Sequence, residues 1–185
     1  MTLTDHLLAT ATATLYTAAI EHPFLTAAAS LSLPTPRLAL YLSQDRIYAA
    51  RAYPRFIAQL ISKIPLDNHN AAPLATRTLS LLVGCLTNIV REVAFFDTTA
   101  RTYNLPLDHG YWRNRKGTRD YTAEMESMGT FASIEDGLVF LWAMEKVPTV
   151  TISLVAYWKS IADLLGRVVR RLSRPPESVH ITNTT

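Results

Sequence analysis

The stretch at residues 74–103 reads LATRTLSLLVGCLTNIVREVAFFDTTARTY, and its pattern decides the fold class. Apolar side chains recur at spacings of three and four residues, which is the periodicity of one buried face of an α-helix. The stripe consists of Leu79, Leu82, Val83, Leu86, Ile89, Val90 and Val93. We therefore expect one long helix here, with the whole stripe turned toward a core.

The remainder of the chain carries the same helical character. It has only six glycines, and no Asn-Gly or Asp-Gly pair stands between two alternating strands, so β-hairpins are not expected. Further helices are expected at residues 4–19, shortly after 22–24, from 34–36 to about 63 with a kink at Pro54, at 120–128, at 134–147 with Pro148 closing it, and at 150–172. The prediction is an all-α protein with one helical bundle over residues 1–172 and a disordered tail at 173–185.

Composition narrows the classes of function. Of the 185 residues, 49% are hydrophobic and 18% are charged, which is typical of a chain that folds around a core. The net charge is only +3, and basic residues gather in two short clusters, at 113–119 and 167–174, that are typical of solvated loops and helix ends. No nucleic-acid partner is expected.

The sequence also predicts a location. Cys85 is the only cysteine, so no intrachain disulfide can form and a reducing compartment is expected. The first residues lack the basic start of a secretory signal, and the most apolar late stretch, 150–165, is interrupted by Lys159 and Asp163. We therefore expect a cytoplasmic protein that does not enter a membrane.

One carboxylate lies among aromatic residues in the segment YLSQDRIYAARAY at residues 41–53. Tyr41, Asp45 and Tyr48 follow one another at spacings of four and three, so they share one helix face, and flanking leucines turn that face partly inward. A half-buried aspartate costs free energy unless it is hydrogen-bonded. Asp45 is therefore either a helix residue that caps a turn or pairs with a neighbouring arginine, or one wall of a binding site.

Two blocks of sequence resemble one protein family. The first consists of His-Pro-Phe at 22–24 and YLSQDRIYAARAYPRF at 41–56, and the second of KGTRDYTAEM at 116–125 and SIEDGLVFLWAMEKV at 133–147. Together they resemble the TenA/thiaminase II family, in its cysteine-lacking, fungal version, over about residues 5–147. The resemblance implies a helical bundle of the haem-oxygenase-like type.

The resemblance also implies roles for single residues. Asp45 matches the family's aspartate that grips an aminopyrimidine ring, Tyr48 the tyrosine beside it, and Tyr121 the tyrosine that lines the ring. A carboxylate can engage the ring nitrogen and the exocyclic amine of an aminopyrimidine with two hydrogen bonds, and aromatic faces suit the flat ring. Tyr41, on the same helix face, is expected to line the substrate as well.

The family's nucleophilic cysteine is missing. Its position is taken by Trp142, which is expected to bind substrate, while Cys85 lies in the apolar stripe of the long helix and is expected to fill the core. A second branch of the family relies on carboxylates, so Glu145, one turn beyond Trp142, becomes the catalytic candidate together with Asp45. The alternative for Glu145 is a surface glutamate that pairs along its own helix.

The resemblance stops abruptly after Val147. The family continues into further helices, one of which bears a catalytic glutamate, whereas this chain continues as PTVTISLVAYWKSIADLLGRVVRRL. The closing helices are therefore expected to be missing or replaced, and a truncated or alternatively spliced product is the hypothesis. Sequencing the transcript across this codon tests it, because an uninterrupted exon without splice signals there would contradict it.

The expected function is hydrolysis of a C–N bond of an aminopyrimidine in thiamine salvage or degradation. The alternative is a catalytically impaired or inactive module that binds an aminopyrimidine or a partner, and a weaker one is a haem- or quinone-handling protein, which rests on fold analogy alone. No metal-ligand spacing and no nucleotide-binding motif is present, so no metal and no cofactor are expected. The expected partner is a small aminopyrimidine, and a homo-oligomer stays open.

Overall fold

The structure is a computed structural model that describes residues 2–10, 13–30, 32–66, 72–102 and 113–151. No strand occurs among these residues, and the expected all-α class is confirmed. The α-helices are α1 Leu3–Thr10, α2 Ala13–Ile20, α3 Pro23–Ala29, α4 Thr35–Ile47, α5 Tyr53–Ser62, α6 Ala72–Thr102, α7 Lys116–Phe131 and α8 Ile134–Thr151. A π-helical turn, η1 Tyr48–Ala52, joins α4 to α5.

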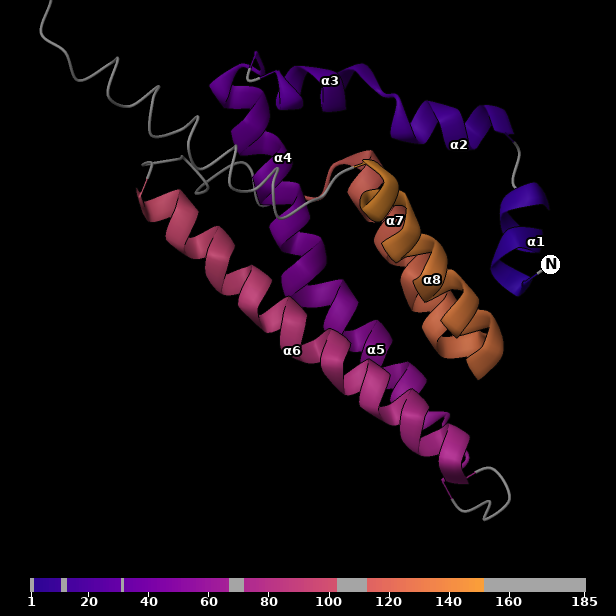
Figure 1. The fold of residues 1–185 in the computed structure, drawn as a ribbon. Helices are drawn as coiled ribbons and strands as arrows, with labels where there is room; N and C mark the ends of the chain where they lie inside the picture. Colours follow the sequence, from indigo (N-terminus) through magenta and orange to yellow (C-terminus); the bar gives the residue numbers. More distant parts are fainter. Residues whose placement is uncertain (1, 11–12, 31, 67–71, 103–112, 152–185) are drawn as a thin grey trace, which may run out of the picture.

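A rod formed by α4, η1 and α5 runs through the middle of the described helices. The long helix α6 lies on one side of it, and the hairpin of α7 and α8 lies on the other (Figure 1). The helix α5 packs against both α6 and α7, η1 touches both as well, and α2 packs against α8. Side chains on the rod can therefore reach two different interfaces.

The core follows this arrangement. Phe56, Ile57 and Leu60 of α5 are at most 1% exposed. Leu82 of α6 and Met125 of α7 are fully buried, each from its own side of the rod. Burial of such side chains is the main favourable contribution to folding, about 1.5–3 kcal/mol for each one. The rod is thus the element on which the other helices assemble.

The apolar stripe of α6 is narrower than the sequence predicts. Leu82, Ile89 and Phe96, seven residues apart, are buried, but Val83 and Val90 are 48% and 67% exposed. Adjacent residues of an α-helix differ by about 100° in direction, so packing against one side of α6 buries only one residue of each pair. The prediction that Val83 and Val90 turn inward is therefore wrong for the described part of the chain.

A π turn accounts for the irregularity expected at Pro54. The backbone N–H of Tyr53 donates to the carbonyl of Tyr48, five residues back, and Pro54 then lies in the first turn of α5. Proline has no backbone N–H, and the N–H groups of a first turn lack a helical partner anyway, so proline is tolerated there. The extra residue of the π turn rotates the following side chains relative to a regular α-helix.

The hairpin of α7 and α8 has a capped turn. The hydroxyl of Ser133 accepts a hydrogen bond from the backbone N–H of Asp136 at 3.1 Å and donates to its carboxylate at 2.8 Å. This reciprocal pair satisfies a backbone donor at the start of α8, as in a capping box. The turn thereby fixes the direction in which α8 returns along α7.

Two glycines let the hairpin approach the rod closely. A Cβ at Gly129 would lie 2.0 Å from the side-chain oxygen of Gln59, and a Cβ at Gly137 would lie 2.3 Å from Cδ2 of Leu60. Both distances are far below van der Waals contact. A side chain at either position would therefore force the side chain of Gln59 or Leu60 to move.

Three helices begin or end at residues other than those that the sequence predicts. Helix α8 continues to Thr151 and passes Pro148, because a proline near a helix end removes only one backbone hydrogen bond. Helix α7 spans Lys116–Phe131 rather than 120–128. The first expected helix consists of α1 and α2, on either side of residues 11–12. Most of the expected 150–172 helix and the whole expected tail at 173–185 lie outside the described residues.

Helix α6 is long and apolar enough, by length and composition alone, to cross a membrane. Its most apolar window has a mean hydropathy of 1.6, and 17% of that window is buried. The core helix of a soluble protein can meet the same criterion, so this is weak support for a membrane span. The expectation that the protein does not enter a membrane stays a prediction.

Candidate functional site

Two adjoining cavities lie where the rod faces α6, α7 and α8. The first has a volume of about 340 Å³ and reaches α6 and α8, and the second has a volume of about 410 Å³ and reaches the start of α7. Tyr41, Asp45, Tyr48 and Met144 line both, so we treat the two as one site, the acidic pocket. Five of the expected site residues line it: Tyr41, Asp45, Tyr48, Tyr121 and Glu145.

Asp45 is half-buried on the wall that the two cavities share. Burial and, after it, the negative charge of Glu92 raise the pKa of Asp45 from 3.8 to about 7, against the opposing effect of a hydrogen bond from Tyr41. Phe24 of α3 packs on Tyr41 with ring centroids 4.9 Å apart. Near neutral pH the carboxyl of Asp45 therefore exists in both protonation states, and a neighbouring positive charge would favour the ionised one.

Glu145 forms a hydrogen bond to the rod. The hydroxyl of Tyr53 donates to Oε1 of Glu145 at 2.8 Å. Burial, and then the charge of Glu145 and this hydrogen bond, raise the pKa of Tyr53, so its phenol stays a protonated donor. Glu145 is exposed and has a hydrogen-bond partner on the rod, and the alternative of a surface glutamate that pairs along its own helix stays open.

Aromatic rings cover the remaining wall. Tyr48 lies with its ring centroid 5.7 Å from that of Tyr121 at an interplanar angle of 32°, and 5.7 Å from that of Tyr53 at 72°. Burial is the largest cause that raises the pKa of Tyr48. Burial and the charges of Glu145 and Asp45 raise the pKa of Tyr121 to about 12. At neutral pH these phenols are uncharged donors with flat apolar faces.

Gln44 fixes the start of α7 against α4. Its Nε2 donates to the carbonyl of Arg113 at 3.1 Å, and its Oε1 accepts from the backbone N–H of Arg115 at 2.8 Å. A side-chain amide that uses both its donor and its acceptor on one segment holds that segment in register. The position of Tyr121, at the second turn of α7, depends on this anchor.

Tyr53 was not singled out by the sequence pattern, and the π turn explains why. Five residues along a regular α-helix correspond to a rotation of about 500°, so the side chain would point about 140° away from Tyr48. The i to i+5 repeat of the π turn brings Tyr53 nearly back to the direction of Tyr48. No signal in the sequence specifies a π turn at this place, although Pro54 marks an irregularity.

Helix α6 contributes polar groups that the sequence pattern missed. Cys85, Asn88 and Glu92 share one face at spacings of three and four and line the first cavity. Cys85 is half-buried and packs against the core, as the sequence predicts, and it is also in hydrogen-bond contact with Tyr53. Burial raises the pKa of Cys85, which keeps it a thiol rather than a nucleophilic thiolate.

Trp142 is placed differently from the other expected residues. It is half-buried on α8, one turn before Glu145, and lines neither cavity. Its role in substrate binding, and the catalytic or binding roles of the five residues in the pocket, stay predictions. Among the residues that the structure describes, no group of three or more His, Cys, Asp or Glu side chains is arranged to hold a metal ion.

The charged side chains among the described residues that line the acidic pocket are all acidic. Asp45, Glu92 and Glu145 supply three carboxyl groups, and no Lys, Arg or His is among the described residues that line either cavity. Burial and the charge of Glu145 raise the pKa of Glu92. Like charges that are brought close together repel each other, and an opposite charge between them relieves this repulsion. The arrangement is complementary to a positive charge with hydrogen-bond donors.

Comparison with known proteins gives one relative. No family model and no solved structure matches the chain. A protein of Fusarium pseudograminearum (strain CS3096), described as a probable transcription factor, is 33% identical to the chain over 134 residues. The aligned part is 71% of this chain and 26% of the relative, so the chain spans about a quarter of the relative's length.

This comparison corrects the expected function. A relative described as a probable transcription factor does not fit an aminopyrimidine hydrolase of thiamine metabolism, so that expectation is wrong. The alternative of an impaired aminopyrimidine-binding module has no support either. Resemblance in two short blocks led to this error, because residues suited to one ligand can line a pocket that serves another.

Proposed function

We propose that the described helices form a small-molecule binding module whose ligand is an organic cation with N–H donors, such as a protonated amine. The observation that carries this proposal is the charge of the acidic pocket. Asp45, Glu92 and Glu145 line it without a basic side chain among the described lining residues. A bound ammonium group would place a positive charge beside these carboxyl groups.

The chemistry of the walls supports this ligand class. Hydrogen bonds between an ammonium group and a carboxylate are charge-assisted and about twice as strong as neutral ones. The faces of Tyr48 and Tyr121 attract a cation electrostatically and pack against an apolar ring. Cavities of about 340 and 410 Å³ are within the usual size range of small-molecule sites.

The haem-oxygenase-like arrangement belongs to the same proposal. Its support is the resemblance at residues 22–24, 41–56, 116–125 and 133–147, together with the helices that bring Asp45, Tyr48 and Tyr121 to one pocket. In such an arrangement the ligand lies between helices of a bundle, where small-molecule sites are often found.

A second candidate concerns the setting of this module. The name of the Fusarium relative favours a part of a transcription regulator, in which the acidic pocket would make the regulator respond to a small molecule. A fluorescent fusion of the chain distinguishes this candidate from the cytoplasmic location that the sequence predicts. Nuclear enrichment favours the regulator, and exclusion from the nucleus contradicts it.

The binding proposal is tested with an amine and its neutral analogue. Benzylammonium should raise the melting temperature of the protein in a saturable way, whereas benzyl alcohol should not. Asp45→Asn or Glu145→Gln should weaken benzylammonium binding at least tenfold, and Glu124→Gln, on an exposed residue outside the pocket, should not. Equal effects of the amine and the alcohol, or equal losses in all three variants, would overturn the proposal.

A further inference from the structure

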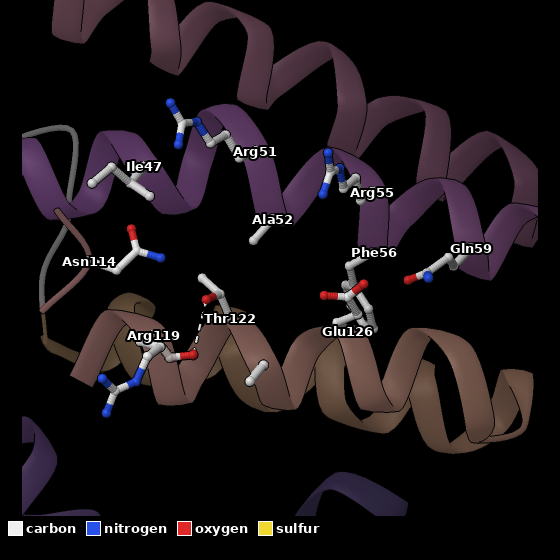
Figure 2. A pocket seen from close by; sticks show the side chains of 11 residues that line it. Ile47, Arg51, Ala52, Arg55, Phe56, Gln59, Asn114, Arg119, Thr122 and Glu126 are labelled. Carbon is white, nitrogen blue, oxygen red and sulfur yellow. Dashed lines mark hydrogen bonds between the residues drawn. The ribbon is translucent and has the colours of Figure 1, made fainter. Parts of the chain in front are cut away.

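A third cavity lies along the seam between the rod and α7. Its volume is about 300 Å³, and it shares no lining residue with the acidic pocket. Arg51 and Arg55 line it from the rod, and Arg119 lines it from α7 (Figure 2). We call this cavity the arginine groove. Neither the expected nor the proposed function uses it.

The arginines reach one cavity because of where their helices meet. Arg51 and Arg55 are four residues apart, one in η1 and one in α5, and both are exposed. Arg119 is exposed in the first turn of α7, where its Nη2 lies 3.3 Å from Oδ1 of Asp120. An exposed ion pair of this kind contributes little free energy to folding, and the carboxylate of Asp120 offsets part of the charge of Arg119.

Neutral and acidic neighbours complete the groove. The exposed amide of Asn114 lies at its end, between the two residues whose backbone is bound by Gln44. Glu126 is the one carboxylate among the residues that line the groove. The lining residues therefore carry three guanidinium groups and one carboxylate; those of Arg51 and Arg55 extend from the rod, and that of Arg119 extends from α7 away from them, beside Asp120 (Figure 2). This is the reverse of the acidic pocket.

We infer that the arginine groove binds the phosphate group of a small phosphorylated molecule. The planar guanidinium group presents N–H donors in a fork that fits two oxygens of a phosphate, and Arg is the residue best suited to this recognition. The negative charge of a phosphate monoester is complementary to the arginines of this lining. A volume of about 300 Å³ is at the lower end for small-molecule sites, which favours a phosphate with a small substituent.

Phenyl phosphate serves as the probe, and its binding to the whole chain is measured by isothermal titration calorimetry. Arg55→Gln should weaken binding at least tenfold, and Arg119→Gln should weaken it several-fold. Glu126→Gln should strengthen binding several-fold, because it removes the opposing carboxylate. Arg91→Gln, on the exposed surface of α6 and outside the groove, is the matched control and should leave binding unchanged.

The result for Glu126→Gln keeps the inference falsifiable even if an arginine variant unfolds. Absence of saturable binding, or an equal loss in Arg55→Gln and Arg91→Gln, would overturn the inference. A duplex oligonucleotide is titrated in parallel, since its backbone offers the same phosphate chemistry. Binding of the duplex without binding of phenyl phosphate would assign the groove to a nucleic-acid surface and would also overturn the inference.

Discussion

The acidic pocket and the arginine groove border the same rod and carry opposite charges in opposite settings. Asp45 is half-buried, and its burial raises its pKa to about 7. Arg51, Arg55 and Arg119 are exposed. Dissolved salt largely screens the interaction between exposed charges that lie more than about 8–10 Å apart, and it screens buried charges much less. The rod therefore borders one site whose charge depends on pH and another site whose charges are screened by salt.

The largest expected effect comes from the side chain that belongs to both the core and the groove. Phe56 is 1% exposed, lines the arginine groove and packs edge-on against Phe140. Phe56→Ala should lower the free energy of unfolding by about 3–5 kcal/mol, because it removes buried apolar surface and leaves a cavity. Chemical denaturation measures the change.

Phe131→Ala is the matched control for that substitution. Phe131 is 86% exposed, so its truncation should change the free energy of unfolding by less than about 0.5 kcal/mol. Equal losses in the two variants would show that the rod is not the centre of the core. In that case the comparison between two sites on one rod would fail.

A substitution at the hairpin should separate the two sites. Gly137→Ala places a methyl group 2.3 Å from Leu60 Cδ2 and should lower the free energy of unfolding by about 1–3 kcal/mol through overpacking. Because α8 carries Met144 and Glu145, amine binding in the acidic pocket should weaken as well. The arginine groove has no lining residue from α8, so phenyl phosphate binding should persist.

Gly84→Ala tests whether this effect is local. A Cβ at Gly84, within α6, meets nothing within 4 Å. Alanine favours the helix over glycine by about 0.5–1 kcal/mol. Gly84→Ala should therefore stabilise the protein, as thermal denaturation can show. Destabilisation by both substitutions would argue against the close approach of α8 to α5.

The pH dependence of stability sharpens the description of the acidic pocket. The pKa of Asp45 is about 7 in the folded protein and near 3.8 in the unfolded chain, so the folded state binds one more proton between these values. The free energy of unfolding should therefore fall as pH rises from about 4 to about 7. Above pH 7 the ionised Asp45 should cost about 1–3 kcal/mol.

Asp45→Asn removes this cost. The variant should be more stable than the parent protein at pH 8 by about 1–3 kcal/mol, and the difference should shrink toward pH 4. Urea denaturation at a series of pH values measures it, with Glu124→Gln as the control. Identical pH profiles of Asp45→Asn and the parent would contradict a half-buried Asp45.

The smallest expected effect on stability is at the arginine groove. Arg55→Gln should change the free energy of unfolding by less than about 0.5 kcal/mol, since Arg55 is exposed. Phenyl phosphate binding should weaken when salt is raised from 50 mM to 500 mM, and amine binding in the acidic pocket should change less. Equal salt dependence at both sites would remove the distinction between them.

Part of the site was predictable because helical spacing places residues on faces. The spacings of four and three put Tyr41, Asp45 and Tyr48 on one side of α4 and η1, and the structure has them line one pocket. Tyr53 could not be found this way, because the π turn departs from the regular period. The contribution of Glu92 depends on which face of α6 meets the rod, which a single helix does not specify.

Other expectations failed for reasons that lie outside local pattern. Val83 and Val90 have the right period for a buried stripe, but the described helices cover α6 on one side only. Trp142 lines neither cavity of the pocket, and its expected role in substrate binding stays a prediction. The expected enzyme of thiamine metabolism rested on two blocks of resemblance, and the relative described as a probable transcription factor overturned it.

The sequence by itself determined that the chain is all-α, because the apolar period and the scarcity of glycine are local properties of helices. It also determined that Asp45 shares a helix face with two tyrosines. Only the tertiary structure decided that Glu92, Glu145 and Tyr53 join that face and that arginines of the rod and of α7 line one cavity along another seam. Those contacts depend on how whole helices pack, and packing is set by long-range burial rather than by any short stretch of sequence.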